Sequence, residues 1–150
     1  MRSMNRLLGF RSTCTLVGVL QIMLACSILL RGARTAMAPF GVPDVVLSSP
    51  HYQDAITWVY VHMAVLGALI ATAGSVVVDP RKQVLFCRVL CAAHLLYLFM
   101  DVRTAESFLG NGLYRGAASN IPTFIGLFFC VLFARLSVAP KAPGTTAGSA

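Results

Sequence analysis

The sequence predicts an all-α membrane protein, an antiparallel bundle of four transmembrane helices. Three observations lead to this fold class. Of the 150 residues, 57% are hydrophobic and 11% are charged, whereas soluble proteins average about 25% charged residues. The apolar residues form four runs, each close to the roughly 20 residues with which a helix crosses a bilayer. The connections between these runs are short, so residues 1–138 are predicted to form one domain.

The predicted spans are residues 14–30, 55–78, 83–100 and 121–138. The first two contain no charged side chain, and the third contains Arg88, whose long stem can reach the nearby interface, where Asp79 could pair with it. Asp79 followed by Pro80 is a helix-start signal, a capping side chain and then a proline in the first turn. Because so few residues separate the second and third spans, we expect them to form a tight antiparallel hairpin.

The first apolar run could instead belong to a cleaved signal peptide, since arginines precede it and residues 36–38 (AMA) resemble a cleavage site. However, Arg31 and Arg34 lie between the run and that site, and Pro39 would follow the cut. We therefore expect this span to be retained.

Basic residues predict the orientation, because cytoplasmic loops carry an excess of Lys and Arg. Four spans place both termini on one side, and that side has eight basic residues and one acidic residue: Arg2, Arg6, Arg11, Arg81, Lys82, Arg88, Arg135, Lys141 and Asp79. The other side has four of each sign: Arg31, Arg34, Arg103, Arg115, Asp44, Asp54, Asp101 and Glu106. Both termini are thus predicted to be cytoplasmic, in a bacterial inner membrane or the endoplasmic reticulum. Topology accounts for the net charge of +7, so no nucleic-acid partner is needed to explain it.

The connections and the tail differ in composition. Residues 31–54 contain three prolines and two glycines and are predicted to be an ordered or semi-ordered loop, and residues 139–150 (APKAPGTTAGSA) a disordered cytoplasmic tail. All five cysteines fall inside predicted spans, which argues against a disulfide framework. Cys87 and Cys91 have the spacing of a metal pair, but we expect them to be packing residues and predict no metal site.

Small residues at four-residue spacing allow helices to approach closely in lipid. Two such stripes are predicted to be helix contacts, one on each of two spans: Gly67, Ala71 and Ser75; Gly126, Cys130 and Ala134.

Polar residues inside the membrane are the candidate site. His62 and His94 each lie seven residues, roughly 10 Å, from the non-cytoplasmic surface, so they can face each other on antiparallel neighbours. Gln21 could extend this cluster, and Tyr97 and Asp101 follow His94 on one helical face, with Asp101 marking the end of the span. Two interpretations stay open. These groups either hydrogen-bond between helices and fix their register, or form a proton-linked or quinone-type pocket or a haem site held by the two histidines.

The sequence contains no recognisable soluble catalytic motif. Residues 39–71, PFGVPDVVLSSPHYQDAITWVYVHMAVLGALIA, and the four-span plan resemble the small four-span DoxX/BphX-like membrane proteins. Residues 92–112, AAHLLYLFMDVRTAESFLGNG, are similar to the ergosterol-biosynthesis scaffold family, which would imply a tether for membrane enzymes. Neither resemblance supplies catalytic residues.

We therefore expect a small, non-enzymatic accessory or scaffold protein of the lipid bilayer that packs against other membrane proteins or against itself. The alternative is a redox or small apolar-ligand protein that binds a quinone or haem through His62 and His94.

Overall fold

The structure, a computed structural model, describes residues 9–105 and 110–138. These residues are mainly helical and include no strand, which confirms the predicted all-α class. Residues 139–150, predicted as a tail, lie outside the described residues, as do three of the cations and one of the acidic residues counted for the orientation.

Four long helices dominate the described part of the chain: α2 (Phe10–Arg31), α5 (Pro50–Val76), α6 (Pro80–Thr104) and α7 (Ile121–Leu136). By length and hydropathy each can cross a membrane, α7 together with the preceding 3-10 turn η2 (Ala117–Asn120). α5 and α6 begin before the predicted spans because a proline in the first turn, not the apolar run, sets the start of each helix. Asp79 caps α6 by accepting a 2.8 Å hydrogen bond from the backbone N–H of Arg81, as predicted.

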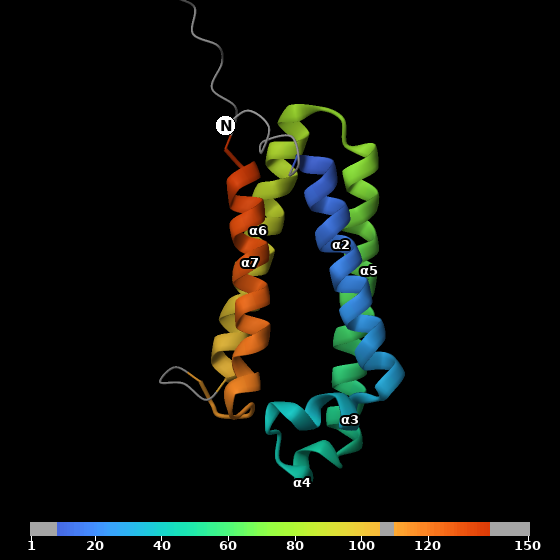
Figure 1. Cartoon of the computed structure of the whole chain (residues 1–150), viewed down its shortest axis with the longest axis vertical. Coiled ribbons are helices and arrows are strands. Elements are labelled where there is room, and N and C mark those ends of the chain that lie inside the picture. The colour runs from blue at the N-terminus through green and yellow to red at the C-terminus, as the bar shows by residue number, and fades with distance from the viewer. Residues whose placement is uncertain (1–8, 106–109, 139–150) are drawn as a thin grey trace, which may run out of the picture.

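Successive long helices run in alternate directions along the long axis, and α2 lies beside α5 while α6 lies beside α7 (Figure 1). The predicted tight hairpin of the second and third spans is wrong, because α5 packs along α2 and α6 packs along α7, with little contact between α5 and α6. A short connection brings two helix ends together, but it does not make the helices pack along their length. The molecule therefore consists of two helix pairs, α2–α5 and α6–α7.

Glycines explain the close packing of α5 against α2. A Cβ built on Gly67 would lie 2.7 Å from the carbonyl oxygen of Gly18, and a Cβ built on Gly74 would lie 2.7 Å from Cβ of Cys14. The backbones of α2 and α5 thus approach as closely as helices do where glycines meet. Gly18 and Gly74 belong to this contact, although the predicted stripe did not include them.

In each predicted stripe the first two residues lie in a helix contact and the third does not. Gly67 and Ala71 face α2 at Gly18, but Ser75 is exposed and Gly74 takes the next contact. The reason is the helical period: seven residues return to within about 20° of the starting face, whereas eight overshoot it by about 80°.

The same shift occurs on α7. Gly126 and Cys130 are buried, and the Cys91 thiol of α6 donates to the Cys130 carbonyl oxygen at 3.7 Å. Ala134 is exposed, whereas Phe133, one residue earlier, is fully buried. The contacting residues of both stripes therefore pack against other helices of this chain.

Two hydrophobic clusters occupy opposite ends of the helices. The terminal cluster lies where α2 begins and α7 ends and draws on all four long helices: Cys14, Val17, Ile70, Cys87, Leu90, Phe129, Leu132 and Phe133. The loop cluster lies at the other end, in and around the first connection: Ala33, Met37, Val42, Leu47 and Ile56. Because the first connection has a small core of its own, it folds into three short helices, α3 (Ala33–Met37), η1 (Ala38–Phe40) and α4 (Asp44–Leu47).

The first and third connections pack against each other. The Arg115 N–H donates to the Phe40 carbonyl oxygen at 2.7 Å, and the rings of Phe40 and Tyr114 lie 6.0 Å apart. Gly41 has φ +67°, and a Cβ there would lie 2.7 Å from the Arg115 carbonyl oxygen, so this contact requires glycine. Burial raises the pKa of Tyr114, which keeps its phenol protonated in this contact. The connections thus join the two helix pairs at the end far from the termini.

Arg88 reaches the end of its neighbouring helix. Its Nε donates to the Ser137 carbonyl oxygen at 3.3 Å, just beyond α7, whereas the sequence had offered Asp79 as its partner. A cation at this position satisfies a carbonyl that the helix end leaves without an intrahelical partner.

Candidate functional site

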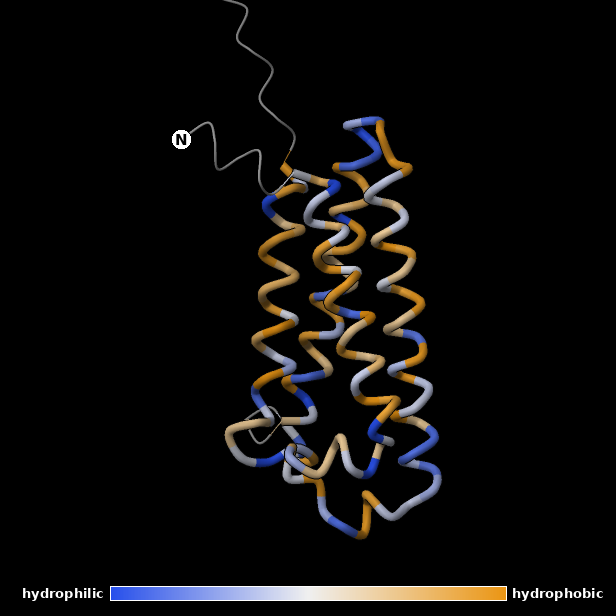
Figure 2. Tube along the Cα trace, turned by 45° about the vertical axis from the view of Figure 1, so that its right-hand side comes forward, coloured by the Kyte–Doolittle hydropathy of each residue, from blue (hydrophilic) through white to orange (hydrophobic). Residues whose placement is uncertain are grey.

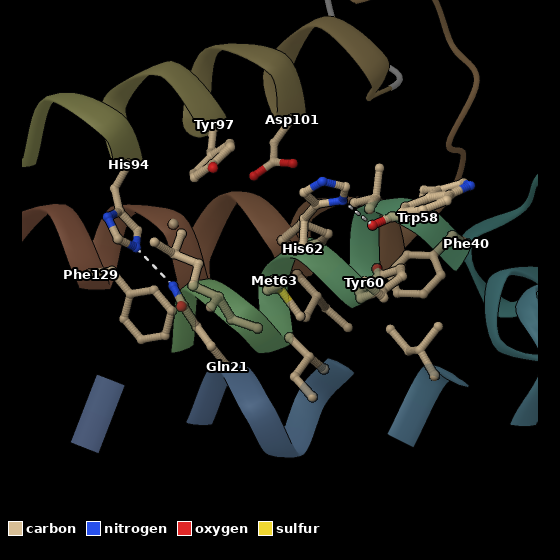
Figure 3. A pocket seen from close by; sticks show the side chains of 18 residues that line it. Gln21, Phe40, Trp58, Tyr60, His62, Met63, His94, Tyr97, Asp101 and Phe129 are labelled. Carbon is tan, nitrogen blue, oxygen red and sulfur yellow. Dashed lines mark hydrogen bonds between the residues drawn. The ribbon is translucent and has the colours of Figure 1, made fainter. Parts of the chain in front are cut away.

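A pocket of about 610 Å³ lies between the two helix pairs, in the half of the molecule toward the connections. All four long helices and η1 contribute to its lining, which is predominantly apolar. The five polar residues predicted as a cluster all line it: Gln21, His62, His94, Tyr97 and Asp101 (Figure 3). The structure thus brings them into one pocket, although not in the predicted pairing.

The inner end of the pocket is built by Gln21 of α2 and His94 of α6. Gln21 Nε2 lies 3.0 Å from His94 Nε2, and His94 Nδ1 lies 2.8 Å from the Leu90 carbonyl oxygen. A carbonyl oxygen can only accept, so Nδ1 carries the proton, and in the neutral ring Nε2 accepts a hydrogen bond from the Gln21 amide. Gln21 is 4% exposed and His94 2% exposed, so this polar contact is buried.

Aromatic rings hold the His94 side chain in place. The rings of Phe129 and Tyr97 meet it edge-on, with centroids 5.5 and 6.0 Å away, and Phe133 lies 5.4 Å away at a tilt. Two of these rings belong to α7, so the imidazole fills part of the space between α6 and α7 and directs Nε2 across to α2.

His62 does not meet His94, contrary to the sequence-based expectation that they face each other. Its Nδ1 lies 2.7 Å from the Trp58 carbonyl oxygen, one turn back on α5, and its side chain is exposed. In Figure 3 the His62 ring lies toward Asp101 rather than toward His94. Because α5 and α6 are not packed together, equal depth does not bring the two histidines into contact.

Asp101 and Tyr60 contribute polar groups at the outer end of the pocket. Asp101 is half-buried, and a Cβ built on Gly126 of α7 would lie 3.6 Å from its Oδ2. α6 continues beyond Asp101 to Thr104, so Asp101 lies in the last two turns of the helix. Along α6, Asp101 is seven residues from His94, a separation of roughly 10 Å.

Exposed side chains mark the mouth of the pocket. Trp58 and Val59 of α5 are 64% and 57% exposed, and Tyr97 of α6 is 51% exposed, although all three line the pocket. The mouth therefore lies at the side of the molecule, between α5 and α6.

Several lining residues were not foreseen from the sequence. Phe40 comes from the first connection, and nothing in the sequence indicates that this loop folds back over the helices. Tyr60 and Met63 lie two residues before and one residue after His62, a spacing that does not indicate a shared helical face.

The predicted haem ligands fit poorly to this geometry. Iron would need one imidazole nitrogen from each histidine, and both nitrogens of His94 already have protein partners. A haem between the two helix pairs would require Gln21 to release His94 and His62 to turn from Asp101.

The outer surface of the helices defines the class of protein. Large apolar side chains are exposed on all four long helices, among them Met23, Leu69, Leu96 and Phe124. Their combined exposed surface is much larger than the apolar patches of soluble proteins. Hydrophobic residues follow the long helices in Figure 2, and hydrophilic residues gather at their ends and connections. The chain is thus a small helical membrane protein. Comparison with protein-family models, curated proteins and solved structures gives no match.

Proposed function

We propose that this chain is an antiparallel four-helix transmembrane bundle whose pocket binds an amphipathic, lipid-like molecule taken from the bilayer. The observation that carries the proposal is the 610 Å³ pocket, apolar in lining, with polar groups at an inner and an outer end. Small-molecule sites are mostly apolar cavities in which a few placed polar groups fix the orientation of the ligand.

The position of the mouth supports access from lipid. Trp58, Val59 and Tyr97 lie within helical stretches that are apolar enough to cross a membrane, so a mouth between them would face acyl chains. With both termini on the cytoplasmic side, as the basic residues predict, the pocket opens in the non-cytoplasmic half of the bilayer. An apolar molecule could enter without passing through water.

This proposal develops the predicted alternative of a quinone-type or other apolar-ligand protein. A quinone-type ring with an alkyl tail has the required combination of a polar head and an apolar body. We propose binding rather than redox chemistry, because the His94 nitrogens are engaged within the protein.

The small-residue stripes give a scaffold role no further support. The small-residue stripes on α5 and α7 were predicted to be helix contacts, and Gly67 faces Gly18 while Gly126 lies against α6, both within this chain. The scaffold role and the two family resemblances stay predictions, and the pocket depends on neither.

Native mass spectrometry of the protein purified in mild detergent tests the proposal. We expect wild-type protein to retain a co-purified molecule of lipid size. Met63→Trp should lose it, because the indole would fill the pocket from α5. Leu69→Trp is the matched control, since Leu69 is on the same helix, 61% exposed and outside the pocket lining. A wild-type protein free of bound molecules after mild extraction, or equal retention by the two variants, would contradict a pocket ligand.

A further inference from the structure

Gln21 has one polar atom that the protein does not satisfy. Its Oε1 is buried and has no hydrogen-bond partner among the described residues, although the residue is 4% exposed and lines the pocket. Buried acceptors without partners are rare in proteins, and a buried acceptor that makes no hydrogen bond is unfavourable. The unsatisfied oxygen therefore needs an explanation from outside the chain.

The hydrogen bonds of His94 explain why the Gln21 oxygen has no partner. Leu90 fixes the proton on His94 Nδ1, so Nε2 is an acceptor and requires the NH2 group of Gln21. Turning the amide over would place Oε1 against Nε2, two acceptors facing each other. As long as His94 is neutral, the amide is held with its nitrogen on His94 and its oxygen without a donor among the described residues, so a donor from the pocket would reach it by displacing the side chains that cover it.

The surroundings of Gln21 limit what that donor can be. The inner end of the pocket is bounded by the rings around His94 and by apolar side chains of α2 and α7, including Leu24, Ile125 and Phe129. A charged head group would be desolvated here without a counter-charge, which is costly. A neutral O–H group on an apolar body is the chemistry that matches one acceptor in an apolar cavity.

We propose that Gln21 and His94 form a head-group site for a hydroxyl-bearing amphipathic molecule, a phenol, quinol or alcohol, whose O–H donates to Gln21 Oε1. This inference rests on the proposed function and adds the class of head group and its direction in the pocket. The head lies at the inner end, and the apolar body extends toward Asp101 and the mouth. His94 acts as a positioning residue, because it orients the amide and does not itself take the ligand's proton.

A pair of probes that differ in one hydrogen-bond donor tests the head-group site. 4-Nonylphenol carries an O–H, and 4-nonylanisole is the same molecule with that hydrogen replaced by methyl. Competition of each unlabelled probe against radiolabelled 4-nonylphenol, in a scintillation proximity assay on purified protein, gives their relative affinities. We expect wild-type protein to prefer the phenol about fivefold, the equivalent of about 1 kcal/mol for one hydrogen bond.

Gln21→Met should reduce the preference to near one while 4-nonylanisole binds as well as before, which shows that the variant is folded and its pocket open. Gln83→Met is the matched control, because Gln83 is a half-buried glutamine at the start of α6, outside the pocket, whose Nε2 donates to the Val77 carbonyl oxygen. It should keep the wild-type preference.

The outcomes separate the two proposals. If both probes bind, Met63→Trp blocks both, and wild-type protein shows no preference for the phenol, the head-group site is wrong while the pocket stands. If binding of both probes is insensitive to Met63→Trp, the pocket itself is not the binding site and both proposals fall.

Discussion

At the end where α2 begins and α7 ends, Ile70, Phe129 and Phe133 fill the space between the two helix pairs, whereas toward the connections the same helices enclose a pocket. The difference lies in the size and kind of the side chains that face the axis. Four and three residues before Phe129 on α7 are Ile125 and Gly126, and on α2 the facing position is the polar Gln21. A filled half holds the pairs together while the other half stays open, and the packed connections keep its far end joined.

The largest expected effect comes from emptying the filled half. Phe133 is fully buried in the terminal cluster, so Phe133→Ala should lower the free energy of unfolding by about 3 kcal/mol or more through the cavity it leaves. Phe128→Ala, on the same helix but 48% exposed, should have little effect. Unfolding by SDS in mixed micelles, followed by circular dichroism, measures both. Equal losses would mean that the terminal cluster does not hold the pairs together.

A smaller effect is expected at the close contact within one pair. Gly67→Ala places a Cβ 2.7 Å from the Gly18 carbonyl oxygen, and such overpacking costs about 1–3 kcal/mol. The matched change at the pocket, Gly126→Ala, meets its nearest atom at 3.6 Å and should be neutral or stabilising by up to about 1 kcal/mol, since alanine favours helix. The same unfolding assay compares them, and a tolerated Gly67→Ala would show that α2 and α5 lie farther apart.

The smallest effect concerns the polar groups of the pocket. In a double-mutant cycle, Gln21→Leu and His94→Leu should be non-additive by about 0.6 kcal/mol, the average for interhelical hydrogen bonds in membranes. His62→Leu and His94→Leu should add, because the structure gives the two imidazoles different partners. Coupling between the histidines together with additivity for Gln21 and His94 would restore the pairing expected from the sequence.

The four long helices could be predicted from the sequence because their causes are local. Hydropathy marks the stretch that tolerates lipid, and Pro50, Pro80 and Asp79 mark helix starts. The pairing of the helices could not be predicted, since a short connection brings two helix ends together without specifying which helices pack along their length. The contact positions were also missed by one residue, at Gly74 rather than Ser75.

The polar residues selected from the sequence line the pocket, but their contacts differ from the expected ones. A depth argument selected Gln21, His62 and His94, all of which line the pocket, because a polar group inside a membrane needs a partner wherever it lies. It could not say which of them meet, since depth does not specify which helices are neighbours. The contribution of Phe40 depends on the docking of two connections distant in sequence, which leaves no local pattern.

Trp58 provides the most direct test of the open half, because it is the chain's one tryptophan and lines the mouth of the pocket. Its fluorescence can be titrated in lipid nanodiscs with 4-(8,9-dibromononyl)phenol, whose bromine atoms, at the end of the tail that extends toward the mouth, quench nearby indole. If an amphipathic molecule enters from lipid, quenching should saturate and be reversed by unbrominated 4-nonylphenol. Quenching that rises in proportion to the probe and is unaffected by the competitor would show that Trp58 faces bulk lipid alone, and would contradict the pocket as a binding site.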